Sequence, residues 1–438
     1  MNNFNEATRV PAPVFDVFNV YFDRIYEPTM HLLFELDGRL DEKCFLKAIT
    51  EYVNSNFYLS SRFIEKNGTF YWEKNPEIQP IDFYFLKEIS GSAESLFECP
   101  PSPVNVYTGP QIKAGIYRNK DYDSVVVSCH HGFCDANGLK LMAKELFSIY
   151  HELKQNTRYR PESKGWYYKG TDEILKIFSK SFLDRVLANE KPFSDRWAFP
   201  SEHKGRGLPK ISCRTFSPER MKKIKAFGKY YGATVNDILM GAFYLALLKI
   251  NSCNSVKDFE KSILTSADVR KYYGREKENY PQNLSVAFEI SLIADKSFEL
   301  KDLIDQITAI TKEKKAGELG LGCIIFYEEM FLKGSEFINN FFDNMILSYN
   351  TNNFKNPVFS NIGIIDENYF KNISGAGNKK LEVKNAWFLP VICWPPGFLM
   401  TASTFKDSLS IISGYEEGPY SKEAVDKFLL YVDSYLPK

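Results

Sequence analysis

Apolar runs with strand-like spacing alternate with amphipathic stretches of helical spacing along the whole chain. A strand pattern is a short apolar run or an alternation residue by residue, whereas a helix pattern repeats about every 3.6 residues. The expected strands are residues 31–36, 69–74, 111–117, 124–129, 261–270, 283–293 and 359–365, with a hairpin over 399–415. The expected helices lie around residues 45–53, 139–153, 172–188, 234–246 and 421–435. This alternation predicts a layered α/β fold.

The chain is long enough for two domains. It has 438 residues, of which 44% are hydrophobic, and a single core rarely grows beyond about 250–300 residues. Residues 155–210 are rich in charges and contain several Pro and Gly, so we place the boundary near 190–210. We therefore expect an N-terminal lobe over residues 1–200 and a C-terminal lobe over residues 201–438.

Composition narrows the partners and the compartment. The formal net charge is +0 and no dense Lys/Arg run occurs, so we expect no nucleic-acid partner. The 8 Cys are scattered without a C-x-x-C pair, which is typical of reduced, mostly buried thiols. The first residues lack a basic stretch followed by an apolar one, and no run approaches the roughly 20 apolar residues of a membrane span. These features predict a cytoplasmic protein with no signal peptide and no transmembrane segment.

The chemistry-bearing stretch is SVVVSCHHGFCDANGLKLM, residues 124–142. An apolar strand ends in the adjacent pair His130 and His131, and a short turn leads through Asp135 into a helix. A strand end holds a ring in a fixed orientation, and His, with an ordinary pKa of about 6.5, can accept a proton near neutral pH. The pattern therefore favours acid–base catalysis.

Other interpretations of this stretch stay open from the residues alone. Adjacent His residues also occur as core or surface residues without a function. Cys129, His130, His131, Cys134 and Asp135 are all possible metal ligands. Adjacent strand residues point to opposite faces, however, and converge poorly on one ion, so we expect no metal site. Cys134 is a weaker candidate still for a nucleophile, because only the His pair is near enough to lower its pKa.

The sequence resembles the chloramphenicol acetyltransferase-like superfamily, which includes alcohol O-acetyltransferases, plant BAHD acyltransferases and nonribosomal-peptide condensation domains. Residues 130–136, HHGFCDA, are similar to the HHxxxDG signature of this superfamily. Further stretches resemble family segments in the same order, and the whole resembles alcohol O-acetyltransferases most. These stretches are residues 36–49, 59–63, 109–117, 232–243, 265–273, 280–288 and 360–365.

The resemblance implies a two-lobed α/β fold in which each lobe is a mixed sheet flanked by helices, with an active-site tunnel between the lobes. It implies an acyltransferase that moves an acyl group, expected to be acetyl, from a thioester to a hydroxyl or amine of a small molecule. The donor would be an acyl-coenzyme A or an acyl carrier protein acting as co-substrate, with no permanently bound cofactor, and the protein is expected to be a monomer. A stand-alone condensation domain that forms amides from carrier-bound substrates and a non-catalytic binding protein of the same fold are the alternatives.

The resemblance also assigns roles to residues. His131 would be the general base, midway along the tunnel. Asp135 would be structural and would pair with Arg270 of the Asp268-Val269-Arg270 segment, pointing away from the tunnel. His130 would also point away from the tunnel and support the loop.

Two further assignments concern the oxyanion and the signature Gly. Ser360 and Asn361 are the candidate oxyanion or substrate groups, although a plain strand edge is an equal alternative for them. The last Gly of the signature is Ala136 here, and Gly138 follows two residues later. Gly138 could rebuild the turn, or the Ala136 methyl could narrow the donor channel, or catalysis could have been lost.

Overall fold

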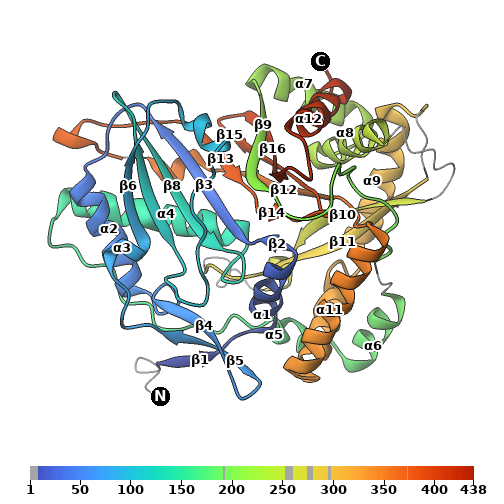
Figure 1. Ribbon diagram of the computed structural model, residues 1–438, viewed down its shortest axis with the longest axis horizontal. Coiled ribbons are helices and arrows are strands. Elements are labelled where there is room, and N and C mark those ends of the chain that lie inside the picture. The colour runs from blue at the N-terminus through green and yellow to red at the C-terminus, as the bar shows by residue number, and fades with distance from the viewer. Residues whose placement is uncertain (1–7, 191–192, 252–259, 274–279, 294–296, 372) are drawn as a thin grey trace.

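The computed structural model describes residues 8–190, 193–251, 260–273, 280–293, 297–371 and 373–438. Cys253 and residues 191 and 192 of the expected boundary region lie outside these ranges. The chain forms two lobes that lie side by side, and each lobe contains one large β-sheet with helices packed against it (Figure 1).

The sheet of the first lobe has five strands in the order β13-β3-β8-β7-β6. Its strands are β3 (Thr29–Leu36), β6 (Tyr84–Glu88), β7 (Lys113–Arg118), β8 (Asp123–His130) and β13 (Val383–Leu389). β6 and β7 are parallel, and the other neighbouring pairs are antiparallel, as the sequence predicts for β7 and β8. β8 is the middle strand and all of its residues are buried, which explains its continuous apolar run.

The sheet of the second lobe has six strands in the order β11-β10-β12-β15-β16-β9. Its strands are β9 (Leu208–Phe216), β10 (Lys261–Asp268), β11 (Ser285–Leu292), β12 (Val358–Ile364), β15 (Leu399–Phe405) and β16 (Ser408–Glu417). β12 is parallel to both of its neighbours, whereas the other pairs are antiparallel. Both sheets are therefore mixed, and the expected α/β fold is confirmed.

Two small sheets complete the strand inventory of the described residues. One contains β1 (Arg9–Pro11), β4 (Ser61–Lys66) and β5 (Thr69–Lys74), and the other contains β2 (Tyr26–Glu27) and β14 (Ile392–Cys393). β13 and β14 come from the last part of the chain, yet they pair with β3 and β2 of the first part. The chain thus crosses between the lobes after residue 200, and the division at that residue stays a prediction.

Helices cover the outer faces of both sheets. In the first lobe they are α2 (Glu42–Ser55), α3 (Pro80–Phe83) and α4 (Ala136–Gln155). In the second lobe they are α7 (Pro218–Tyr231), α8 (Val235–Ile250), α9 (Leu300–Ala316) and α12 (Lys422–Tyr435). The remaining helices are α1 (Val14–Tyr21), α5 (Asp172–Leu175), α6 (Lys180–Asn189), α10 (Leu321–Leu332) and α11 (Ser335–Asn352). Short 3-10 helices are η2 (Phe22–Arg24), η3 (Ala93–Phe97), η4 (Val269–Tyr272), η6 (Glu367–Phe370) and η7 (Ala376–Asn378).

The two sheets pack against each other through an apolar cluster. Leu33 of β3 and Val126 of β8 meet Ile211 of β9 and Ile412 of β16 there. The intervening residues of β3 and β8 face the helices instead, since successive side chains of a strand point to opposite faces. β8 is thus fixed on both sides, and its end is a rigid platform for the residues that follow.

One expected helix differs from the structure. The stretch 172–188 is interrupted between α5 and α6, and the side chain of Ser179 accepts a hydrogen bond from the backbone of Phe182 to start the second helix. A Ser side chain competes for backbone donors in this way at the start of a helix. The capping box expected for α8 is present, with Thr234 and Asp237 each bonded to the other's backbone.

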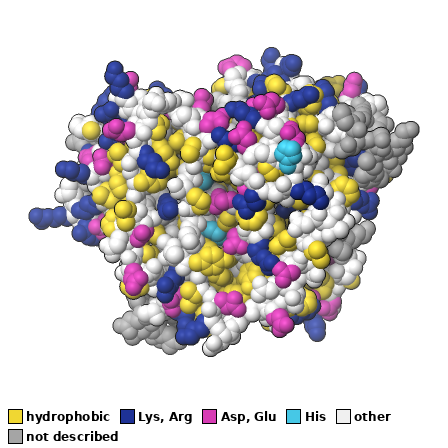
Figure 2. Space-filling model, viewed as in Figure 1, with side chains coloured by type: hydrophobic (Ala, Val, Ile, Leu, Met, Phe, Trp, Pro, Cys, Tyr) yellow, Lys and Arg dark blue, Asp and Glu magenta, His cyan; other side chains and the backbone are white. Residues whose placement is uncertain are grey.

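No single helix in the described ranges is long and apolar enough to cross a membrane, and only the pair α7 and α8, bent by 99°, passes the length and composition test when the two are joined. On the face shown in Figure 2, Lys and Arg side chains are interspersed with Asp and Glu. This mixing agrees with the formal net charge of +0.

Candidate active site

The His pair lies where β8 ends and a tight turn leads to α4. His130 is the last residue of β8, and the backbone N–H of His131 donates to the carbonyl of Pro28 at 2.8 Å. A side chain on Gly132 would place its Cβ 2.4 Å from Val20 of α1. Only Gly therefore lets α1 pack this closely against the turn.

His130 is a buried ring that supports the turn. Its Nδ1 accepts a hydrogen bond from the backbone N–H of Gly132 at 2.9 Å. Burial, and to a smaller extent the neighbouring His131, lowers the pKa of His130 to about 3. By the alternation of β8 it lies on the same face as Val126, the face that packs toward the second sheet. The hydrogen bond ties His130 to the turn, and its expected orientation away from a tunnel between the lobes stays a prediction.

His131 is half-buried and is the more accessible ring of the pair. Burial lowers its pKa, while its own backbone, the charges of Asp135 and Asp16 and the Asn283 amide favour the protonated form. The balance leaves the imidazole neutral near pH 7. A neutral imidazole has a free lone pair and is suited to accept a proton from an acceptor.

Asp135 forms a buried ion pair with Arg270, as the resemblance implied. The two guanidinium nitrogens lie 2.8 and 2.9 Å from the two carboxylate oxygens. The side chains are 9% and 4% exposed for Arg270 and Asp135. Burial by itself raises the pKa of Asp135, but the charge and hydrogen bonds of Arg270 together with two backbone donors outweigh it and lower the pKa. Asp135 is therefore an anion near neutral pH and is not suited to act as a base.

The same carboxylate connects the two lobes. It accepts hydrogen bonds from the backbone of Gly138 in α4 and of Leu284 just before β11. Arg270 in turn donates to Asp268, at 3.2 Å, and to the carbonyl of Gln282. Asp268 thus orients Arg270, and the pair binds the His loop to the second lobe.

Ser360 and Asn361 lie on β12 and are half-buried. The Ser360 hydroxyl is 3.0 Å from that of Ser266, and the Asn361 side-chain oxygen accepts from the backbone of Gly363. Lys140 joins this strand to α4, the helix that follows the His loop, because its Nζ donates to the carbonyl of Ile362 at 2.9 Å. An oxyanion role for Ser360 and Asn361 stays a prediction.

Ala136 and Gly138 occupy the first turn of α4. Ala136 is the first residue of α4, so it has a helical backbone conformation that does not require Gly. Its side chain is half-buried against the apolar core of the first lobe. A Cβ on Gly138 would lie 2.6 Å from that of Cys134. Gly138 is thus required by close packing, whereas Ala136 adds only a methyl group.

The thiols beside the motif contact each other. The sulfur atoms of Cys129 and Cys134 lie 3.5 Å apart, and Cys134 is 3.7 Å from the sulfur of Met142. Burial raises the pKa of Cys134 well above that of an ordinary thiol, which argues against a nucleophilic role. Within the part of the chain that the structure describes, no three His, Cys, Asp or Glu side chains form a group that could hold a metal ion.

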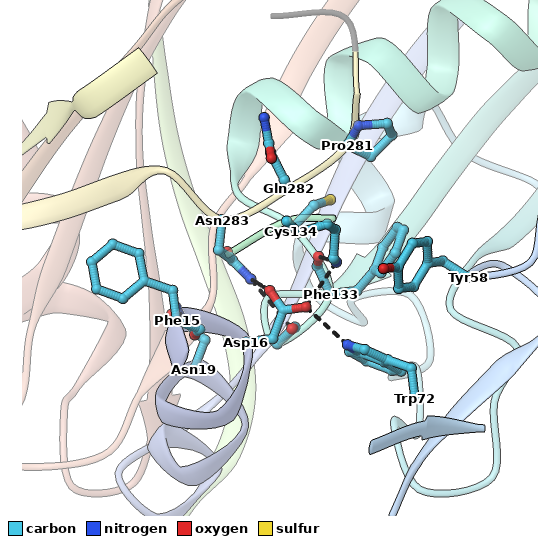
Figure 3. Close-up of polar contacts among 12 residues, drawn as sticks. Phe15, Asp16, Asn19, Tyr58, Trp72, Phe133, Cys134, Pro281, Gln282 and Asn283 are labelled. Carbon is cyan, nitrogen blue, oxygen red and sulfur yellow. Dashed lines mark hydrogen bonds and ion pairs between the residues drawn. The ribbon is translucent and has the colours of Figure 1, made fainter. Parts of the chain in front are cut away.

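Sequence reasoning gave no site role to three buried polar residues that adjoin the His loop, Asp16, Lys169 and Asn283. Asp16 of α1 lies between the side chains of Asn283 and Trp72 and is hydrogen-bonded to both (Figure 3). Lys169 pairs with Asp16 at 2.8 Å and donates to the carbonyl of Phe133. The sequence did contain a usable signal. Asp16 is the lone acid in the apolar stretch VFDVFNVY of α1, and the five other buried residues of this helix are all apolar.

Three comparisons with known proteins bear on this site. A family model described as "Condensation domain" matches residues 22–257. Bacitracin synthase 3 of Bacillus licheniformis is 19% identical over 282 residues, which are 60% of this chain and 4% of that protein. The chain therefore spans a small fraction of the length of this curated relative.

The fold is also shared with solved structures. A trichothecene 15-O-acetyltransferase from Fusarium sporotrichioides superposes with a TM-score of 0.74 at 14% identity, over 98% of this chain and 95% of that one. The first condensation domain of the CDA synthetase superposes with a TM-score of 0.65 at 14% identity, over 98% of this chain and 95% of that one. At these identities the likeness concerns the fold.

Proposed function

Because the chain belongs to the condensation-domain family, we propose that it transfers an acyl group from a thioester to a hydroxyl or amine, with His131 as the general base. The resemblance inferred from the sequence is confirmed by the matched family model, and this is a family of acyltransferases. The reaction, the donor and the residue roles given below are the proposal.

The observation that carries the proposal is the state of His131. Its ring follows a fully buried strand, its pKa is lowered by burial, and the loop that bears it is bound to the second lobe through Asp135 and Arg270. A ring that is neutral, half-accessible and fixed in place is what general-base catalysis needs.

In the proposed reaction the acceptor hydroxyl or amine lies against His131. A ring nitrogen takes the acceptor proton while the acceptor oxygen or nitrogen attacks the thioester carbonyl. The tetrahedral oxyanion forms, collapses and breaks the C–S bond, and the thiolate leaves and recovers the proton from the imidazolium. No acyl-enzyme is required, and base assistance of this kind contributes about 10²–10⁴-fold.

The oxyanion needs hydrogen-bond donors that are already in place. Ser360 and Asn361 are the side chains we propose, and Lys140 supports that role because it holds β12 beside α4. Burial lowers the pKa of Lys140 to about 8, so near pH 7 it is mainly a cation beside the proposed site. Its positive charge would also favour a developing oxyanion.

For the donor we propose an acyl-coenzyme A with a short acyl group, acetyl first. The acetyltransferase that shares the fold supports this choice. A carrier-bound donor is the second candidate, supported by the match to bacitracin synthase 3. In either case the co-substrate is consumed in each turnover, and the acceptor is a small molecule.

The test is a thiol-release assay with acetyl-coenzyme A and, separately, an acetylated carrier protein, each against a panel of alcohols and amines. We expect acceptor-dependent thiol release and an acetylated product of the corresponding mass. Release only from the carrier, with an amide product, would establish the condensation reaction instead. Absence of any acceptor-dependent release, with the acceptors still bound, would favour a non-catalytic binding protein.

A further inference from the structure

We propose that Asp16, Lys169 and Asn283 form a buried positioning unit that orients the His131 ring, an inference that rests on the proposed role of His131 as the base. These residues come from α1, from the segment between α4 and α5, and from the turn before β11. Asp16 and Asn283 face each other in Figure 3, and Lys169 pairs with Asp16.

The unit contains a fully desolvated ion pair. Asp16 and Lys169 are 2.8 Å apart and their side chains are 1% and 0% exposed. Trp72 donates its indole N–H to Asp16 at 2.9 Å. Burying two charges is expensive, and apolar residues of similar size often serve stability equally well. Stability alone therefore does not explain this buried pair of charges, and we assign it a positioning role.

Lys169 is directed at the loop. Its Nζ donates to the carbonyl of Phe133 at 2.8 Å, and it lies over the Phe133 ring, 4.4 Å from the centroid. The ring of Tyr58 lies 4.6 Å away on another side. The aromatic rings and Asp16 hold the ammonium group in place. The carbonyl of Phe133 is thereby fixed two residues after His131.

Asn283 holds the neighbouring carbonyl. Its side-chain nitrogen donates to Asp16 at 2.9 Å and to the carbonyl of Gly132 at 3.2 Å. Both of these partners can only accept hydrogen bonds, so the NH2 group must face them and the side-chain oxygen must face the other way. The orientation of the Asn283 amide is thus determined by Asp16 and by the His loop itself.

The free oxygen of Asn283 has a matching partner in His131. Among the described residues, neither that oxygen nor Nδ1 of His131 has a well-aligned hydrogen bond, and both atoms are buried. Burial is the largest influence on the pKa of the ring and lowers it, while the backbone of His131 itself and, to a smaller extent, the Asn283 side chain favour the protonated form. An acceptor beside Nδ1 favours the tautomer that carries the proton on Nδ1, which leaves Nε2 as the nitrogen with a free lone pair.

The charges that act on His131 come from several elements. Asp16 of α1 and Asp135 at the start of α4 favour the protonated ring, and each is paired with a cation, Lys169 and Arg270 respectively. His130 of β8 is neutral because burial lowers its pKa to about 3. Removal of the Asp16 charge together with that of Lys169 should therefore disturb the position of the ring more than its ionisation.

The test combines spectroscopy with kinetics. Nitrogen NMR of the full chain labelled in its His rings, assigned with His131→Ala, should show Nδ1 protonated and Nε2 unprotonated in the native protein at pH 7.5. Asn283→Ala should mix the two tautomers and lower kcat by about 10- to 100-fold, with a smaller change in KM. Asn283→Asp should not restore the native signal, because it adds a charge beside Asp16.

The matched control is Asn356→Ala, since Asn356 is another fully buried Asn whose amide bonds a backbone carbonyl and a carboxylate, far along the chain. It should leave the His131 signal and kcat unchanged. If Asn283→Ala proves unstable, the double variant Asp16→Asn with Lys169→Met removes both charges together and should also mix the tautomers.

A native-like His131 signal in both Asn283→Ala and the double variant would overturn the inference, as would an equal effect of Asn356→Ala. The NMR readout does not require turnover. A protein without acyltransferase activity but with the expected tautomer change would refute the proposed function and leave the positioning unit standing.

Discussion

Arg270 reaches the loop that carries His131 by binding both oxygens of Asp135, at 2.8 and 2.9 Å. The bond joins the segment after β10 to the first residue position before α4, so it fixes the two lobes relative to each other at the candidate site. A two-pronged pair of this kind is geometrically specific as well as strong. It is the clearest structural reason for the fixed position of the His loop.

Removal of one partner of this pair should be costly. Arg270→Met leaves the buried Asp135 carboxylate without its cation, and we expect a loss of about 3–5 kcal/mol in the free energy of unfolding. Urea unfolding followed by circular dichroism measures this loss. Arg270→Lys should recover only part of it, because a single ammonium group cannot bind both oxygens in the same geometry.

The control is the exposed pair of Lys176 and Asp172, whose side chains are 70% and 32% exposed. Lys176→Met should change the unfolding free energy by no more than about 1 kcal/mol. An Arg270→Met protein as stable as the native chain would show that the pair does not hold the lobes together.

Acid should destabilise the protein through its buried His residues. Burial lowers the pKa of His31 and His130 to about 3 each, whereas an unfolded His titrates near 6.5. Between these values the unfolded chain binds more protons than the folded one, so stability is complete above about pH 6.5 and falls as the pH drops toward 3. The expected slope is about 1.4 kcal/mol per pH unit for each His.

Unfolding free energies at pH 5, 6 and 7 for the native chain and for His31→Asn measure that slope. The variant should show a flatter dependence, since one titrating group is gone. His203→Asn is the matched control, because His203 is exposed. Equal slopes for the native chain and His31→Asn would contradict the buried, neutral state of His31.

Ala136 gives a prediction about the acyl chain. It begins α4, shortly after His131 in the sequence, and its methyl group is half-buried against the core of the first lobe. If the acyl chain of the donor passes this methyl group, each methylene that overpacks the site would cost about 1–3 kcal/mol. The native chain should then prefer acetyl- over octanoyl-coenzyme A, and Ala136→Gly should gain on octanoyl with little change on acetyl.

The ratio of kcat/KM for the two donors is the quantity to compare. Equal ratios for the native chain and Ala136→Gly would mean that Ala136 does not control donor length. Turnover by Ala136→Gly alone would instead indicate that the Ala at this position has removed catalysis from the native chain.

Local patterns predicted much of this structure. The strand that carries the His pair, the helix after it and the capping box of α8 follow from residues close together in the sequence. The pair of Asp135 and Arg270 came from the family resemblance, since nothing local links residues that are 135 positions apart. The single helix expected over residues 172–188 was wrong, because the capping Ser179 interrupts it.

Other features could not be predicted from pattern alone. α11 buries only Ile338 and Phe342 among its described residues, so it presents no continuous apolar stripe. β13 pairs with β3, which lies hundreds of residues earlier, and such pairing leaves no local signal. Lys169 lies in a charged, Gly-containing segment that shows no strand or helix pattern, and it is buried with its charge matched by Asp16 of α1.

The most direct test of the central claim compares His131→Ala with His130→Ala in the acceptor-dependent release of thiol from acetyl-coenzyme A. His131→Ala should remove turnover, by about 10²–10⁴-fold, while near-native circular dichroism and melting temperature show that the fold remains. His130→Ala should lose less, since that ring only supports the backbone of Gly132, and His203→Ala should match the native rate. Full activity of His131→Ala, or a larger loss in His130→Ala, would contradict the assignment of His131 as the base.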